Sequence, residues 1–206
     1  MKIRKRKKIT PPIIAFLGTD GSGKSTIIDA LKDSFLAPQI TGVFIHHRSK
    51  GLPKPENEII LHQEKPPHSP ILSVGKIIIR FSKWFYSYYI GRWRKLRQEG
   101  FLILQDRPYF YDMAIDPIRY RYGGPIKLLW LFAKLPPQAD VYIMLDAPTE
   151  ILLTRKQEIP EKELIRQQSH YKKLTKSLPK SHIVSTDQPL EKVVNEISQI
   201  IISYLS

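Results

Sequence analysis

The segment that most restricts the fold of this chain is a glycine-rich stretch between two apolar segments. Residues 18–25, GTDGSGKS, match G-x-x-x-x-G-K-[ST] at every fixed position. Before them, IIAFL (13–17) is a short continuous apolar run, typical of a strand buried on both faces. After them, apolar residues at positions 27, 28, 31 and 35 share one face of a helix. The order of strand, glycine loop and helix predicts a phosphate-binding loop.

Each residue type in this loop suits a nucleoside triphosphate. Glycines allow tight turns that aim several backbone N–H groups at one phosphate, and the next helix directs its positive end there. We expect Lys24 to contact the β- and γ-phosphates and Ser25 to offer its hydroxyl to Mg²⁺. The predicted nucleotide-binding residues are Gly18, Thr19, Asp20, Gly21, Ser22, Gly23, Lys24, Ser25 and Thr26. An ordinary glycine-rich turn is the alternative, and the flanking strand and helix disfavour it.

Short apolar segments alternate with helical patterns along the rest of the chain. The sequence predicts strands over 42–46, 101–105, 140–145 and 181–185, and helices over 71–98, 148–156, 161–178 and 189–204. The proline-rich segment 49–70 is expected to be irregular. This alternation predicts an α/β fold with a parallel sheet covered by helices on both faces. Ligands of such sheets bind at the carboxyl ends of the strands, so we expect the site there.

The charge of the chain indicates anionic partners. Lys and Arg number 33 against 19 Asp and Glu, which gives a formal net charge of +14. Such an excess attracts nucleotides, phosphosugars, nucleic acid or an acidic membrane surface. Residues 1–12 are predicted to be a disordered basic tail, which either contacts nucleic acid or an anionic membrane or simply aids solubility. Residues 13–206 are predicted to form a single domain.

The composition also excludes several kinds of site. The chain has no cysteine, which rules out disulfides, thiolate-bound zinc or iron–sulfur clusters, and thiol catalysis. Its six histidines show no metal-ligand spacing. The N-terminus lacks the apolar stretch of a signal peptide, and charged residues interrupt the most apolar candidate span, residues 77–93. We therefore expect a cytoplasmic protein.

Several segments resemble thymidylate kinases, in the order in which that family carries them. FLGTDGSGKST (16–26) resembles the family's P-loop, and EGFLILQDRPY (99–109) resembles its third strand and D-R-Y motif. Residues 139–156 resemble its fourth strand and the start of its lid, and 166–174 and 182–201 resemble the elements after the lid. The resemblance covers nearly the whole chain. It implies a P-loop nucleoside monophosphate kinase fold, with a five-stranded parallel sheet flanked by helices and a helical lid.

The resemblance also implies roles for residues at matching positions. Asp106 would help to hold Mg²⁺ through water or would polarise the acceptor, and Arg107 would clamp the acceptor's phosphate. Asp20 would face the acceptor sugar. The P-loop contains no arginine, so the lid, about 154–167, would supply the cation over the γ-phosphate. Arg155 is the first choice for that cation, with Lys156 and Arg166 next.

The acceptor side departs from the family's pattern. HHRSKGLPKPE stands in place of an R-E-P-G-G-type stretch, and Arg48 is expected to take the role of its arginine. The position of a helix arginine falls on Tyr86, with Arg80 and Lys83 nearby. FYDMAIDPIRYRYGGP (110–125) replaces the run that contacts thymine. Its basic and aromatic residues 119–122 form either part of a different acceptor pocket or a packed surface loop.

These observations predict an ATP-dependent phosphotransferase that uses Mg²⁺ and moves the γ-phosphoryl group to a nucleoside monophosphate, with dTMP as the first guess. The first alternative is a kinase for another phosphorylated or hydroxyl acceptor, such as a sugar phosphate. The second is a non-catalytic nucleotide-binding switch. A nucleic-acid or membrane-surface protein that uses the basic tail and the aromatic helix is a further reading. The resemblance also implies a homodimer formed through helices near the aromatic residues 84–93.

Overall fold

The computed structural model describes residues 10–35, 37–46, 66–156 and 160–205. Arg48, residues 1–9 of the basic tail, residues 49–65 of the segment 49–70 and residues 157–159 of the predicted lid lie outside these ranges. The strands are β1 (Ile13–Leu17), β2 (Gly42–His46), β3 (Phe101–Asp106), β4 (Val141–Asp146) and β5 (Ser181–Ser185). The helices are α1 (Lys24–Ser34), α2 (Pro70–Tyr89), α3 (Arg92–Gln98), α4 (Tyr109–Ile115), α5 (Ile126–Lys134), α6 (Thr149–Arg155), α7 (Glu161–Ser177) and α8 (Leu190–Ser203).

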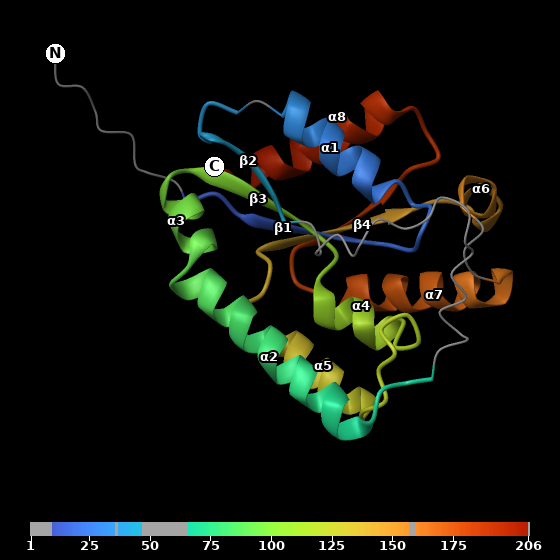
Figure 1. The fold of residues 1–206 in the computed structure, drawn as a ribbon. Helices are drawn as coiled ribbons and strands as arrows, with labels where there is room; N and C mark the ends of the chain where they lie inside the picture. Colours follow the sequence, from blue (N-terminus) through green and yellow to red (C-terminus); the bar gives the residue numbers. More distant parts are fainter. Residues whose placement is uncertain (1–9, 36, 47–65, 157–159, 206) are drawn as a thin grey trace, which may run out of the picture.

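The strands form one five-stranded parallel sheet in the order β2-β3-β1-β4-β5. Helices α1 and α8 cover one face, whereas α4, α5 and α7 cover the other, with α2 outside them (Figure 1). The central strand β1 is fully buried and alternates its side chains between these layers. Ile14 and Phe16 pack with α1 and α8, and Ala15 and Leu17 pack with α4, α5 and α7. The predicted fold class is therefore confirmed.

The helices between β2 and β4 differ from the prediction. The helix expected over 71–98 is two helices, because α2 ends where the N–H groups of Ile90 and Gly91 both donate to the Tyr86 carbonyl. Helices α4 and α5 were not predicted. Both segments, YFYDMAI and IKLLWLFAK, are only seven and nine residues long and mostly apolar, so each offers too few turns for a helical pattern to stand out. Among the described helices, none is long and apolar enough to span a membrane.

Candidate active site

The glycine loop forms the turn between β1 and α1 that its sequence predicts. Gly18 has a φ of +135°, and a Cβ atom there would lie 2.5 Å from the Leu145 carbonyl oxygen. A side chain is therefore excluded at the point where the loop leaves the sheet. Helix α1 begins at Lys24 with no acidic residue in its first turn and no side-chain cap at Gly23. Its first N–H groups are thus suited to an anion.

Lys24 lies folded against the loop. Its Nζ atom donates to the carbonyl oxygens of Gly18 at 2.8 Å and Thr19 at 2.5 Å, and to Ser22 Oγ at 3.0 Å. Burial and repulsion by Arg107 lower the pKa of Lys24 to about 7, although nearby carboxylates oppose the shift. A buried ammonium of this kind gains charge stabilisation when phosphate oxygens replace neutral carbonyls.

Asp106 and Arg107 reach the loop because β3 lies beside β1 in the sheet. The Arg107 N–H donates to the Phe16 carbonyl at 3.2 Å, which fixes the end of β3 next to the P-loop. Arg107 itself has a φ of +65°, the left-handed conformation that non-glycine residues seldom adopt. This bend turns the chain out of β3 and toward α4.

Two oxygen groups near the loop suit Mg²⁺. Asp106 Oδ1 is buried and has no hydrogen-bond partner among the described residues, and Ser25 is exposed in the first turn of α1. The described residues contain no cluster of three or more His, Cys, Asp or Glu side chains that could hold a metal. Mg²⁺ usually binds through one or two protein oxygens together with phosphates and water, so this donor set fits the ion.

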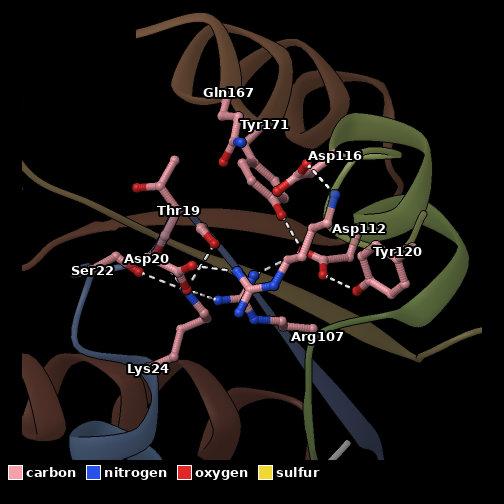
Figure 2. Close-up of polar contacts among 12 residues, drawn as sticks. Thr19, Asp20, Ser22, Lys24, Arg107, Asp112, Asp116, Tyr120, Gln167 and Tyr171 are labelled. Carbon is pink, nitrogen blue, oxygen red and sulfur yellow. Dashed lines mark hydrogen bonds and ion pairs between the residues drawn. The ribbon is translucent and has the colours of Figure 1, made fainter. Parts of the chain in front are cut away.

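Asp20 in the P-loop bridges two arginines from other elements. One carboxylate oxygen accepts from Arg107 and the other from Arg119, which lies between α4 and α5. Figure 2 shows Asp20, Lys24 and Arg107 converging at the mouth of the loop. Burial raises the pKa of Asp20, but Arg107, Arg119 and Lys24 outweigh burial and hold it well below the usual value. The carboxylate is therefore charged and paired.

Asp112 on α4 holds Arg107 from its other side. Its Oδ1 accepts from Arg107 Nη1 at 3.0 Å and from the Tyr171 hydroxyl, and its Oδ2 accepts from the Tyr120 hydroxyl (Figure 2). Burial raises the pKa of Asp112, but the Arg107 charge and both hydroxyl donors lower it more. Tyr171 comes from α7, so one buried carboxylate connects α4, α7 and the D-R motif.

Sequence reasoning did not identify Asp112 or Tyr171 as site residues. Of the four residues 119–122 that it left open, Arg119 and Tyr120 reach this network. Arg121 and Tyr122 do not, because Arg121 donates to the Pro66 carbonyl at 3.0 Å and Tyr122 to the Pro125 carbonyl at 3.1 Å. No local motif marks the difference, since only the packing of α4 decides which side chains turn inward.

A cavity of about 290 Å³ adjoins the network on the side of α2. Its lining combines aromatic rings, cations and the D-R motif: His46, Arg80, Lys83, Trp84, Ser87, Trp93, Gln105, Asp106, Arg107, Tyr109 and Phe110. Arg80 stacks on Tyr109, with its guanidinium carbon 4.1 Å from the ring centre. Gln105 is buried and its Oε1 has no partner among the described residues. Arg80 and Lys83, which lie near the position of the family's helix arginine, thus line the same cavity as Asp106.

The two arginines of the predicted lid, Arg155 and Arg166, make hydrogen bonds outside the network of Asp20, Arg107 and Asp112. Arg155 donates to the carbonyl and hydroxyl oxygens of Thr186, at 2.9 Å and 3.2 Å. It lines a cleft of about 250 Å³ with Gly23, Thr26, Ile27, Thr186, Gln188, Leu190 and Val193. Arg166 pairs with Glu163 at 2.6 Å and donates to the Ile115 carbonyl at 2.8 Å. Arg155 therefore lies at the α1 end of the site, and its predicted role over a γ-phosphate stays a prediction.

Comparison with solved structures shows which known proteins share this fold. No protein-family model matches the sequence, and no curated protein matches it. The structure is similar to thymidylate kinase from Candida albicans, with a TM-score of 0.63, 18% identity, and coverage of 95% of this chain and 92% of that one. Deoxyadenosine kinase from M. mycoides gives a TM-score of 0.62 at 16% identity, and the match covers 93% of this chain and 99% of that one. Thymidylate kinase from Ehrlichia chaffeensis gives a TM-score of 0.60 at 16% identity, and the match covers 93% of this chain and 98% of that one. The chain shares the P-loop kinase fold of these proteins.

Proposed function

We propose that this protein transfers the γ-phosphoryl group of ATP to a nucleoside monophosphate, with dTMP as the first acceptor to test. The observation that carries the proposal is the shared position of Arg107. Its guanidinium binds Asp20 of the P-loop and also lines the aromatic cavity beside Asp106. A phosphate-binding loop and a separate cavity that share an arginine suit two phosphorylated ligands whose phosphates meet.

The cleft beside α1 is the better candidate for the donor nucleoside. It adjoins Gly23 of the P-loop and the first turns of α1, where the phosphates would bind. Arg155 there presents a planar guanidinium that Thr186 holds in place. Such a group can stack on a base. We therefore assign Arg155 to the donor side.

The lining of the larger cavity favours a nucleotide over a sugar phosphate. Trp84, Trp93 and Phe110 offer ring faces for a planar base, while Arg80 and Lys83 offer charge to a phosphate. The unpartnered oxygen of Gln105 suits an N–H group of a base. A sugar phosphate would use the cations but would leave the rings without a planar partner. The deoxynucleotide products dCMP and dCDP bound to the M. mycoides enzyme belong to the same class of ligand.

The described residues would act mainly by positioning and charge. Lys24 would leave the carbonyls of its own loop and contact donor phosphates, while Arg107 holds the acceptor phosphate in line with them. Ser25 and Asp106 would hold Mg²⁺, which when bound neutralises charge on the donor phosphates. Asp106 ends β3 and also lines the cavity, so a metal held there would lie near both ligands.

The test measures ADP formation from ATP and Mg²⁺ with dTMP, dUMP, UMP, CMP, AMP, GMP, nucleosides and phosphosugars. We expect turnover with a nucleoside monophosphate and its loss in Lys24→Met, which keeps the length of the side chain without its charge. Turnover with a phosphosugar alone would keep the reaction and change the acceptor. ATP binding without turnover for any acceptor would favour the nucleotide-binding switch and contradict the proposal.

We also propose that the chain forms a homodimer through the outer face of α2. Ile71, Ile79 and Tyr86 lie on one side of that helix and are 87%, 57% and 59% exposed. Large apolar side chains that gather on one helix face usually mark a contact surface. The opposite side of α2 is held by Ile77, which packs with α4 and α5.

A further inference from the structure

We propose that Arg119 is a catalytic residue that supplies the cation over the transferring phosphoryl group. The inference rests on the proposed function, because it assigns a role within that reaction. Arg119 belongs to the connection between α4 and α5 and therefore lies outside the lid. Its guanidinium is nevertheless paired with Asp20 inside the P-loop.

The position of Asp20 places Arg119 where the phosphates meet. Asp20 directly follows Thr19, whose carbonyl oxygen accepts from Lys24. Its two carboxylate oxygens face different arginines, Arg107 from β3 and Arg119 from the α4–α5 connection. Arg119 thus reaches the P-loop from a different element than Arg107 and binds the other oxygen of the same carboxylate. A cation there faces the non-bridging oxygens of a phosphoryl group that passes between donor and acceptor.

The two arginines are held differently. Arg107 is fixed on both sides, because Asp112 binds it at 3.0 Å and two tyrosine hydroxyls hold Asp112 in turn. The Arg119 side chain pairs with Asp20, and its backbone N–H donates to Asp116 at 3.1 Å. The Arg119 side chain is also more exposed, at 21% against 11% for Arg107. Arg119 is therefore the arginine that can move from Asp20 onto a phosphoryl group.

The lid cations compete poorly for this role in the described structure. Arg155 is engaged by Thr186, and Arg166 by Glu163 and the Ile115 carbonyl. Lys156 also attracts the Asp20 charge, but more weakly than Arg119 does. Arg119 is thus the cation outside the D-R motif that interacts most strongly with the P-loop carboxylate.

The reaction leaves a clear task for such a cation. The bond between the γ-phosphorus and the β–γ bridging oxygen breaks, and its electron pair stays on that oxygen as ADP leaves. A bond forms between the γ-phosphorus and a phosphate oxygen of the nucleoside monophosphate, which as a dianion has no proton to give up. Arg119 neutralises charge on the non-bridging oxygens during this transfer.

The experiment compares Arg119→Ala and Arg119→Lys with the wild-type protein. We expect kcat to fall at least about 100-fold in Arg119→Ala, with a smaller change in the KM for ATP. Free guanidinium should restore part of the rate to Arg119→Ala, because the missing group is then supplied from solution. Arg121→Ala is the matched control, since it removes a cation two positions away that donates to Pro66 outside the site. It should retain the wild-type rate.

The outcomes separate this inference from the proposed function. Wild-type turnover with Arg119→Ala within about threefold of it would overturn the role of Arg119 and leave the proposed function standing. A large loss that guanidinium does not rescue, accompanied by a lower thermal midpoint in both variants, would make Arg119 structural and overturn the inference. An inactive wild type would overturn both.

Discussion

Arg107 lies between two carboxylates, and the one farther from the P-loop decides how firmly it is held. Asp112 is buried and accepts from Arg107, Tyr120 and Tyr171 at once. Replacing it with Asn leaves a buried guanidinium with one charged partner. We expect Asp112→Asn to lower the free energy of unfolding by about 3 kcal/mol. The KM for the acceptor should rise more than the KM for ATP, as steady-state kinetics would show.

The same substitution has a predictable pH dependence. Because the pKa of Asp112 lies below its usual 3.8 in the folded protein, its contribution to stability is present above pH 3.8 and is lost as the pH falls through the lower value. The stability gap between wild type and Asp112→Asn should therefore narrow in acid. Burial raises the pKa of Asp116, so the charged Asp116 costs stability at neutral pH and this cost disappears in acid. The stability of wild type relative to Asp116→Asn should therefore increase as the pH falls. Urea titrations at pH 7, 5 and 3 measure both trends, and a gap that does not depend on pH would contradict the assignment.

Among the P-loop glycines, Gly18 is the one whose substitution should reduce ATP binding and stability most. A Cβ atom would lie 2.5 Å from the Leu145 carbonyl and 2.9 Å from Ser22 Oγ, in a backbone conformation that side chains rarely adopt. We expect Gly18→Ala to weaken ATP binding at least tenfold and to destabilise the fold by about 1–3 kcal/mol. Calorimetric titration with a non-hydrolysable ATP analogue tests this. Gly75→Ala on α2, where a Cβ atom meets nothing within 4 Å, should bind normally.

The elements differ in how far their sequences reveal them. The strands were predicted within one residue, because buried strands appear as short apolar runs that turns interrupt. Helices α4 and α5 were missed, because each is short and mostly apolar. The omission extended to the site. Asp112 lies on α4 and Arg119 on the connection that follows, so neither could be placed without packing.

Helix α2 provides a probe of the acceptor cavity that does not depend on turnover. Trp84 lines the cavity and donates from Nε1 to the Pro137 carbonyl at 2.9 Å, and its ring packs edge-on against Trp93. A base that stacks there should quench tryptophan fluorescence, and we expect saturable quenching by the acceptor in the absence of ATP.

Variants of the tryptophans identify the source of this signal. Trp84→Phe should lose most of the quenching, because it keeps an aromatic ring without the indole. Trp130→Phe should keep it, since Trp130 lies on α5 and packs against Tyr111 outside the cavity lining. Trp93 lines the same cavity, so quenching that is equal in wild type and in a Trp84→Phe/Trp93→Phe double variant would place the acceptor elsewhere.

The whole site combines segments that are far apart in the chain. Parallel topology alone predicts that the P-loop after β1 and Asp106 at the end of β3 meet, because both lie at the carboxyl edge. The sequence therefore predicts that Lys24, Asp106 and Arg107 lie at the same edge of the sheet. The second arginine partner of Asp20 could not be predicted in this way, since Arg119 lies 99 positions away in sequence and reaches it through tertiary packing. The positive net charge of +14 indicated anionic ligands but not where they bind.

At the scale of the whole molecule, the exposed apolar face of α2 leads us to expect a dimer. We expect light scattering to give a mass twice that of one chain. The side chains of Ile71, Ile79 and Tyr86 are exposed to water in a single chain, and their burial against a second copy would be favourable. Ile79→Glu would place a charge in the contact and should give monomers. Ile183→Glu changes an isoleucine of β5 that is 46% exposed, and it should leave the dimer intact. A wild-type protein that stays monomeric at high concentration would show that α2 does not pair with a second copy.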